Sequence, residues 1–220
     1  MKLLDNNRKE YKQNNFTVVK NTLHPQLIDF LYDYCKLRTD NLYLYKNNNI
    51  NFPYRKSTDG TFDDEQVKNA SSFYGDPYME IMLLKMQDIV SYITNKKLAP
   101  NYSYWRLYMQ GSELKAHIDR PECELSTTLF VGSDIANCPN KDYNWPLFIR
   151  SKKKNIPVYL TPGDMIIYNG IKLKHWREPF EGNNHAQIFL HYNDLKNGKG
   201  KIFDNRLRIG LPQVFENNAN

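Results

Sequence analysis

Three side chains of this sequence could together bind a metal ion: His117, Asp119 and His175. His117 and Asp119 are separated by one residue. On an extended chain both therefore lie on the same face, because side chains alternate with a period of two. His175 lies 56 residues beyond Asp119, on a stretch predicted to be a strand. If that strand lies beside the first, two imidazoles and one carboxylate would bind one side of the metal and leave the other side open.

Two histidines and one carboxylate are typical of non-haem Fe(II) sites, where the open positions receive a cosubstrate and oxygen. Zinc accepts the same ligands, so the residues alone do not name the metal. His185 and His191 compete with His175 for the third position, and we expect them to face a pocket or the core instead. In a simpler interpretation, His117 and Asp119 form only a hydrogen-bonded pair on a polar strand.

The composition is that of a folded chain with a sizeable core. At 220 residues it suits one domain, and 16 Tyr and 11 Phe favour strands with large buried rings. The three cysteines form no Cys-x-x-Cys pair, which argues against a disulfide framework or a zinc finger. We find no signal peptide and no run long enough to span a membrane, so we expect a soluble cytoplasmic protein. The net charge of +6 indicates a solvated basic surface.

The order of the predicted elements indicates an α+β fold, in which N-terminal helices support a sheet. Residues 1–15 are polar and predicted to be a loose start before a strand at 16–20. Helices are predicted from Pro25, with His24 at its start, and from Asp76 to about Asn95. The stretch 46–72 between them is irregular in pattern and could be a substrate-contacting loop or a solvated connector.

After Pro100 the hydrophobic period changes from 3.6 to two, and turn signals separate eight short segments. The predicted strands are 102–109, 114–119, 124–131, 145–150, 156–160, 165–168, 173–177 and 186–192. So many short strands indicate a jelly roll over about 101–193, supported by helices within about 1–100. The tail, 194–220, is expected to pack only through apolar side chains, namely Ile202, Phe203, Leu207, Ile209 and Leu211.

Three motifs between Asn101 and Asn193 resemble one enzyme family. They are Arg106-Leu-Tyr108…Gly111…Leu114-Lys-Ala-His117-Ile-Asp119-Arg120, Ser126-Thr-Thr-Leu-Phe-Val, and Gly163-Asp-Met-Ile-Ile-Tyr168…His175-Trp-Arg177-Glu-Pro179-Phe180. The sequence there is similar to the Fe(II)/2-oxoglutarate-dependent dioxygenases, in particular their prolyl-4-hydroxylase-like branch. The resemblance implies a double-stranded β-helix in which His117, Asp119 and His175 bind Fe(II). It also implies that the enzyme uses O2 and the cosubstrate 2-oxoglutarate to hydroxylate an unactivated C–H bond, for example in a peptidyl proline or another amino-acid residue.

The sequence departs from this family at the cosubstrate carboxylate. The family usually has an Arg or Lys about ten positions after the last histidine ligand, and His185 stands there. Arg177 is the first candidate to replace it, because on a continuing strand it faces the same side as His175. Arg106 is the second candidate, and a protonated His185 is a third. Tyr108 and Thr128 could add hydroxyl hydrogen bonds, and Arg120 at the expected pocket mouth could contact a peptide or small-molecule substrate.

Two other functions fit parts of the pattern. The first is oxidative demethylation of alkylated nucleic-acid bases, which requires stacking aromatics and a basic stripe. Tyr43, Tyr45, Tyr54 and Arg55 could serve there. The second is a cupin-like barrel that binds a metal without oxidation, for which His185 is the best support.

Overall fold

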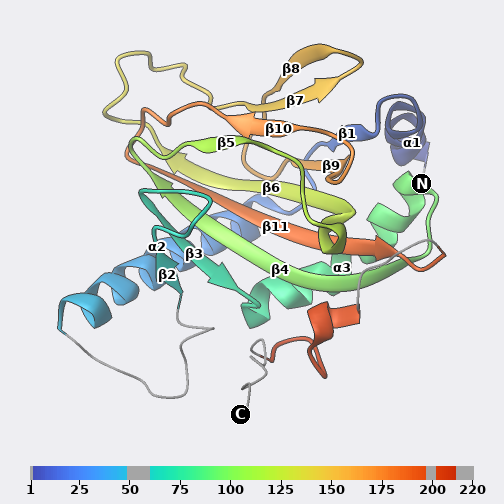
Figure 1. The fold of residues 1–220 in the computed structure, drawn as a ribbon. Helices are drawn as coiled ribbons and strands as arrows, with labels where there is room; N and C mark the ends of the chain where they lie inside the picture. The colour runs from blue at the N-terminus through green and yellow to red at the C-terminus, as the bar shows by residue number, and fades with distance from the viewer. Residues whose placement is uncertain (1, 49–59, 197–201, 212–220) are drawn as a thin grey trace.

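Two antiparallel β-sheets face each other in the computed structural model, which describes residues 2–48, 60–196 and 202–211 (Figure 1). The seven-stranded major sheet has the order β1-β9-β6-β11-β4-β3-β2, and the four-stranded minor sheet has the order β5-β10-β7-β8. The major-sheet strands are β1 (Phe16–Val19), β2 (Thr61–Phe62), β3 (Ala70–Tyr74), β4 (Leu98–Met109), β6 (Leu125–Asp134), β9 (Met165–Asn169) and β11 (Asn184–Asp194). The minor-sheet strands are β5 (Leu114–His117), β7 (Leu147–Ser151), β8 (Lys154–Val158) and β10 (His175–Arg177). This arrangement is the predicted double-stranded β-helix.

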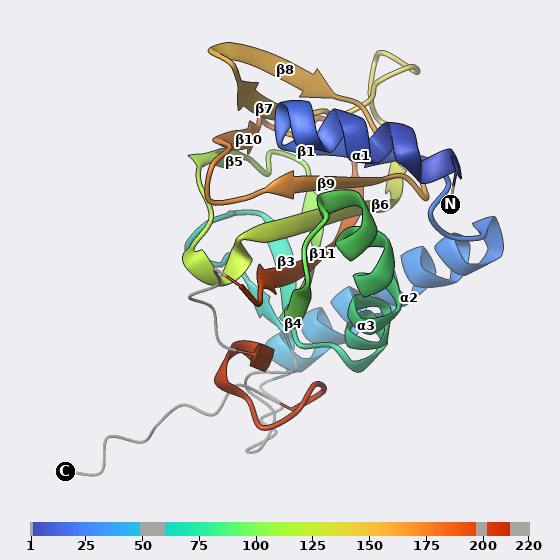
Figure 2. The ribbon, with the colours of Figure 1, turned by 90° about the vertical axis from the view of Figure 1, so that its right-hand side faces the viewer.

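Three helices support the major sheet: α1 (Lys2–Asn14), α2 (Pro25–Asn47) and α3 (Pro77–Thr94) (Figure 2). Their buried side chains form one core with the sheet, which includes Leu31, Leu83 and Trp105. A second core, which includes Phe130 and Ile149, contains side chains from both sheets. Apolar burial of this kind stabilises the sandwich by about 25 cal/mol per Å² removed from water. Among the described residues, no helix is long and apolar enough to cross a membrane.

Local capping explains where the two long helices begin. His24 accepts a hydrogen bond from the Gln26 backbone N–H at 3.4 Å, and Pro25 follows at the first helical position. The Asp76 carboxylate accepts from the Tyr78 N–H at 3.0 Å in the same way. Both predicted starts are confirmed.

The prediction of a loose N-terminus is wrong, because residues 2–14 form α1. The polar side chains that suggested disorder are used in tertiary contacts. The Asn7 amide donates to Thr17 Oγ1 and to the Val18 carbonyl, and Asp5 accepts from the Tyr92 hydroxyl. Tertiary hydrogen bonds thus stabilise a helix with little apolar surface of its own.

The irregular stretch 46–72 was also incompletely predicted. It contains β2 and the start of β3, and β3 pairs with β4. Residues Ala70 to Phe73 are all buried, so the strand lacks the alternation that marks a half-exposed strand. The loop between β2 and β3 borders the candidate site described below.

The described part of the tail is anchored by polar groups, which the sequence did not predict. Arg206 forms a buried ion pair with Glu80 at 2.6 Å, and Asp204 accepts from the Tyr74 hydroxyl at 2.8 Å. In contrast, Leu207 is 89% exposed and Ile202 is 51% exposed. The expected apolar anchoring through those two side chains is therefore wrong.

Candidate metal centre

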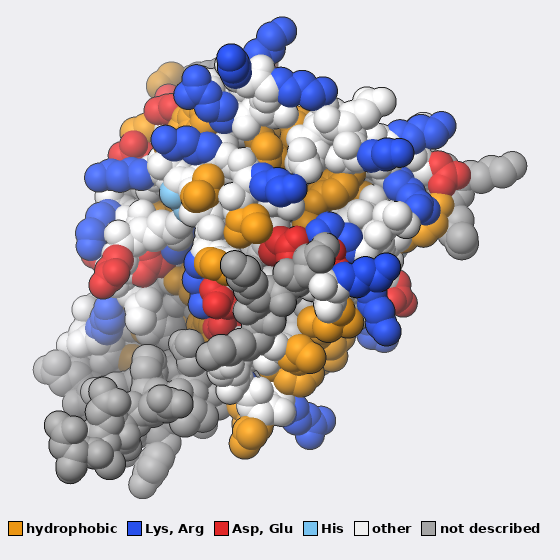
Figure 3. All heavy atoms as spheres, turned by 45° about the vertical axis from the view of Figure 1, so that its right-hand side comes forward, with side chains coloured by type: hydrophobic (Ala, Val, Ile, Leu, Met, Phe, Trp, Pro, Cys, Tyr) orange, Lys and Arg blue, Asp and Glu red, His pale blue; other side chains and the backbone are white. Residues whose placement is uncertain are grey.

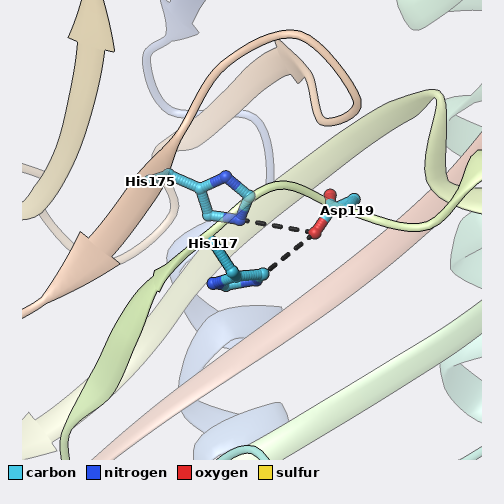
Figure 4. A group of neighbouring side chains, drawn as sticks. All are labelled: His117, Asp119 and His175. Carbon is cyan, nitrogen blue, oxygen red and sulfur yellow. Dashed lines mark ion pairs between the residues drawn. The ribbon is translucent and has the colours of Figure 1, made fainter.

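The three predicted ligands converge because β5 and β10 are neighbouring antiparallel strands. His117 ends β5, His175 begins β10, and the two residues are direct partners in the register. Asp119 follows β5, where its backbone N–H donates to the Gly170 carbonyl at 2.9 Å. Figure 4 shows both imidazoles pointing toward the Asp119 carboxylate.

The distances fit a compact ligand set. His117 Nε2 lies 3.5 Å and His175 Nε2 lies 3.4 Å from Asp119 Oδ1. One ligand atom from each residue lies within 4.8 Å of the others. Each Nδ1 lies within hydrogen-bond distance of the backbone carbonyl two residues earlier, Lys115 at 2.8 Å and Leu173 at 2.9 Å. Nδ1 therefore carries the hydrogen, and the Nε2 lone pairs face the centre.

The Asp119 carboxylate is kept charged by its surroundings. Burial alone would raise the pKa of this carboxyl, but the close approach of the His117 and His175 imidazoles outweighs burial and holds the pKa well below its usual range. Ser126 Oγ donates to Asp119 Oδ2 at 2.7 Å. The second oxygen is thereby occupied, while Oδ1 faces the imidazoles.

Gly170 makes room for this carboxylate. A Cβ at Gly170 would lie 2.9 Å from Asp119 Cγ, closer still to Oδ2, and 2.6 Å from the Cys123 carbonyl oxygen. The sequence did not indicate the roles of Ser126 and Gly170. Ser126 begins one of the motifs described above, and Gly170 lies in the gap of another, between Tyr168 and His175.

A pocket of about 720 Å³ opens beside the three ligands and includes Arg177 in its lining. Arg177 is 2% exposed, and its Nη1 donates to the Trp145 carbonyl at 2.7 Å while the guanidinium lies 4.7 Å from the Trp145 ring centre. Burial lowers the pKa of this guanidinium to about 10, although Tyr108 and Tyr168 oppose that effect. Within the described ranges no acidic side chain forms an ion pair with it. A buried cation without a counter-ion favours an anionic ligand.

Other polar groups surround this guanidinium. Thr128, Tyr168 and Gln187 line the pocket. The Gln187 Oε1 and Tyr108 Oη atoms are buried and have no hydrogen-bond partner within the described part of the chain. Tyr108 does not line the pocket, but it lies near enough to Arg177 to influence its pKa. An unpaired buried polar atom at a pocket, such as Gln187 Oε1, indicates a place where a ligand could bond.

His185 lies outside the residues that line the pocket and is packed in the core. Its ring stacks on Phe130 at 4.3 Å and also contacts Trp145 and Phe180. Burial, together with the charge of Arg177, lowers its pKa well below the usual value, so the ring is neutral near pH 7. Gln187 Nε2 donates to His185 Nε2 at 2.7 Å. His185 therefore does not supply a cation.

The other two predicted arginines line the pocket with their charges already paired. Arg106 Nη2 contacts Asp64 Oδ2 at 2.6 Å, and Arg120 Nη2 contacts Asp204 Oδ2 at 3.0 Å. The Arg106 side chain is buried, and the Arg120 side chain is partly exposed near the mouth of the pocket. Because each guanidinium has its own carboxylate, neither needs an added anion as Arg177 does.

His191, the other competitor for the third ligand position, lines the same pocket. Its Nδ1 lies 3.0 Å from Ser126 Oγ, and its ring lies 4.6 Å from that of Tyr102. His191 therefore contacts Ser126, which holds the Asp119 carboxylate, and not the three predicted ligands themselves.

Of the aromatic residues considered for base stacking, Tyr43 packs against Phe62, with 4.1 Å between the ring centres. Tyr54 and Arg55 lie outside the described residues.

No protein-family model and no curated protein matches this sequence. Solved structures do match it. A prolyl-4-hydroxylase from Pseudomonas putida is 12% identical, with a TM-score of 0.63, and the match covers 86% of this chain and 97% of that one. HygX from Streptomyces hygroscopicus, with nickel and 2-oxoglutarate bound, is 8% identical, with a TM-score of 0.64 and coverage of 86% and 87%. This chain has the same fold as these two structures. A Trichoplax adhaerens prolyl hydroxylase in complex with a hypoxia inducible factor peptide fragment is 13% identical, with a TM-score of 0.59 and coverage of 89% and 90%.

Proposed function

We propose that this protein is a non-haem Fe(II)- and 2-oxoglutarate-dependent oxygenase that hydroxylates a C–H bond. The observation that carries the proposal is the buried Arg177, which has no acidic partner among the described residues and shares a pocket with His117, Asp119 and His175. A metal site alone would not require a buried cation. A metal site next to a buried cation suits a ligand that has one end on the metal and an anionic group at the other end.

The ligand set fits Fe(II). Two neutral imidazoles and one carboxylate bind the metal on one side and leave the pocket side for a cosubstrate and O2. When bound, Fe(II) and 2-oxoglutarate would supply the oxidising chemistry, in which O2 converts 2-oxoglutarate to succinate and CO2 and one oxygen atom forms the substrate hydroxyl. Ser126 and Gly170 would support this set by holding the Asp119 carboxylate in place.

Arg177 would bind the distal carboxylate of 2-oxoglutarate. A guanidinium can donate two parallel hydrogen bonds to a carboxylate, and such charge-assisted bonds are about twice as strong as neutral ones. Thr128 and Tyr168 line the pocket, and their hydroxyls could complete the carboxylate's hydrogen bonds. The unpaired Tyr108 hydroxyl is a further candidate, because Tyr108 lies near Arg177 although it is outside the pocket lining. In this role Arg177 replaces the basic residue that resembling enzymes have at the position of His185.

The remainder of the pocket would bind the substrate. It is lined by aromatic rings, among them Tyr74, Tyr102, Tyr104 and Phe189, with Arg120 near the mouth. About 720 Å³ is enough for 2-oxoglutarate and a side chain or small molecule beside it. We propose a peptide or small-molecule substrate, which agrees with the peptide complex of the Trichoplax structure.

The charge distribution gives less support to a nucleic-acid substrate. On the face that Figure 3 shows, Lys and Arg side chains are spread out, with acidic and hydrophobic side chains between them. A phosphate backbone is better matched by a continuous basic stripe. Salt-sensitive binding to single-stranded DNA or RNA would support the demethylase alternative.

The deciding experiment is an anaerobic titration of the protein with Fe(II) and then with 2-oxoglutarate. We expect a visible charge-transfer band after the second addition, followed by succinate release when O2 is admitted. Iron binding without a band, and without succinate, would contradict the proposal and favour a barrel that binds metal but does not oxidise.

A further inference from the structure

Gln66, on the loop between β2 and β3, contacts one of the proposed metal ligands and lines the same pocket. Its Nε2 lies 2.8 Å from His117 Nε2. Its Oε1 accepts a hydrogen bond from Arg106 Nη2 at 2.9 Å, so the amide orientation is determined. His117 Nδ1 is the protonated nitrogen, because it lies 2.8 Å from the Lys115 carbonyl. The Gln66 N–H therefore donates to the His117 Nε2 lone pair.

The loop that presents Gln66 is fixed by its own side chains. Asp64 Oδ1 accepts from the backbone N–H groups of Gln66 and Val67, at 3.0 and 2.8 Å, and Asp63 Oδ1 accepts from that of Asn69 at 2.7 Å. Val67 is 1% exposed and anchors the loop in the apolar interior. The contact with His117 is thus made from a loop that is held by hydrogen bonds and by the buried Val67, although the Gln66 side chain itself is exposed.

Arg106 ties this loop to the major sheet. Its Nε and Nη2 donate to Asp64 Oδ2 at 3.1 and 2.6 Å, and the same oxygen accepts from the Tyr104 hydroxyl at 2.8 Å. The residue considered from the sequence as a cosubstrate ligand therefore orients Gln66. Asp64, Glu65 and Gln66 all line the pocket.

We propose that Gln66 is a positioning residue that competes with the metal for His117 Nε2, and that it thereby couples metal binding to the 63–69 loop. The inference depends on the proposed function, because it requires His117 to be a metal ligand. One lone pair cannot serve an amide donor and a metal together. Metal binding must therefore break this contact between the loop and β5, and the Gln66 side chain must move within the pocket. Val67 and Leu114 of β5 remain in the same apolar cluster, so the loop stays attached while its polar contacts adjust.

The first test is a Co(II) titration of the wild type, Gln66→Ala and Lys68→Ala, followed by the visible absorption of the bound ion. The net contribution of a hydrogen bond is about 1 kcal/mol, so we expect Gln66→Ala to bind Co(II) about fivefold more tightly. Lys68→Ala is the matched control, because Lys68 is exposed on the same loop and lies outside the pocket lining, where its Nζ donates to the Asp63 carbonyl at 3.4 Å. This variant should bind Co(II) like the wild type. Unchanged or weaker binding by Gln66→Ala, or equal tightening by Lys68→Ala, would overturn the inference.

The second test is hydrogen exchange at the loop amides of Gln66, Val67 and Asn69, with and without Co(II). In the wild type we expect Co(II) to speed exchange at these amides, since the metal removes the side-chain contact. In Gln66→Ala, exchange at Val67 and Asn69 should not depend on Co(II). Exchange rates at these amides that do not change when Co(II) is added to the wild type would contradict the coupling.

The two proposals fail in different ways. If neither the wild type nor Gln66→Ala binds Co(II) more tightly than His175→Ala does, the proposed metal centre is wrong and the role of Gln66 fails with it. If both bind Co(II) tightly and equally, the metal centre stands and only the role of Gln66 is removed.

Discussion

Ser126 Oγ donates a hydrogen bond to Asp119 Oδ2 at 2.7 Å and lies 3.0 Å from His191 Nδ1. A hydroxyl has one hydrogen, and the charged carboxylate is the strongest acceptor near it. The neutral His191 ring therefore donates from Nδ1 to Ser126. The three residues form a chain that fixes one carboxylate oxygen and turns the other toward the histidines.

The first prediction concerns Ser126→Ala. Loss of this hydrogen bond frees the Asp119 carboxylate to rotate away from His117 and His175, and loss of a group that holds a metal ligand typically weakens metal binding about 10- to 100-fold. We expect that loss in a Co(II) titration, with an unfolding temperature close to that of the wild type. Thr127→Ser, which changes the neighbouring buried residue, should bind the metal normally. Wild-type affinity in Ser126→Ala would show that Asp119 is held by other groups.

Gly170→Ala should have a stronger effect on the same carboxylate. The added methyl would overlap Asp119 and the Cys123 carbonyl oxygen, so one of them must move. Such overpacking typically destabilises a fold by about 1–3 kcal/mol. We expect metal affinity to fall by at least about tenfold while the circular dichroism spectrum is retained. If Gly170→Ala binds metal like the wild type, the carboxylate is not confined by this glycine.

The proposed metal ligands could be singled out in the sequence because the evidence for them is local. His117 and Asp119 are separated by one residue, although Asp119 lies just beyond the end of β5, and His175 lies on a predicted strand. Strand parity correctly placed Arg177 on the pocket side with His175. The eight strands were found for a similar reason, since alternation and turn residues depend on neighbours in sequence.

Residues that act across long sequence separations could not be found in this way. Gln66 lies 51 positions before His117 in a stretch without periodicity. Arg106 resembled a cosubstrate ligand until its partner Asp64 was known, because a sequence does not show which charges are already paired. The role of Gly170 could not be seen in the sequence, since the carboxylate that needs its space comes from the segment after β5.

The buried His191 gives the protein a pH-dependent stability. Burial lowers its pKa to about 4, although Asp119 opposes that effect, whereas an unfolded histidine has its ordinary pKa of about 6.5. Between these values the unfolded state binds the extra proton, so stability falls as pH is lowered through that range. At pH 5 this residue should lower the free energy of unfolding by about 2 kcal/mol relative to pH 7.5.

Urea denaturation of the wild type and His191→Gln at the two pH values would measure this effect. The variant lacks the titrating group, so its stability should depend less on pH by about the same 2 kcal/mol. His185 is also buried with a lowered pKa and remains in both proteins, so the comparison isolates His191. Equal pH dependence in the two proteins would mean that His191 is protonated equally in the folded and unfolded states.

The final prediction tests the role of Arg177 in cosubstrate binding. Arg177→Met removes the charge while keeping much of the buried volume, which separates electrostatics from packing. Hydrogen bonds to charged groups contribute about 1.5–3 kcal/mol, so we expect the KM for 2-oxoglutarate to rise about 10- to 100-fold. Co(II) affinity should be unchanged, because Arg177 is not a metal ligand. Arg150→Ala, at an exposed arginine on β7, should keep the wild-type KM. An unchanged KM in Arg177→Met would mean that another group binds the distal carboxylate of 2-oxoglutarate. Arg106 would be the next residue to change, because it is the other buried guanidinium in the pocket.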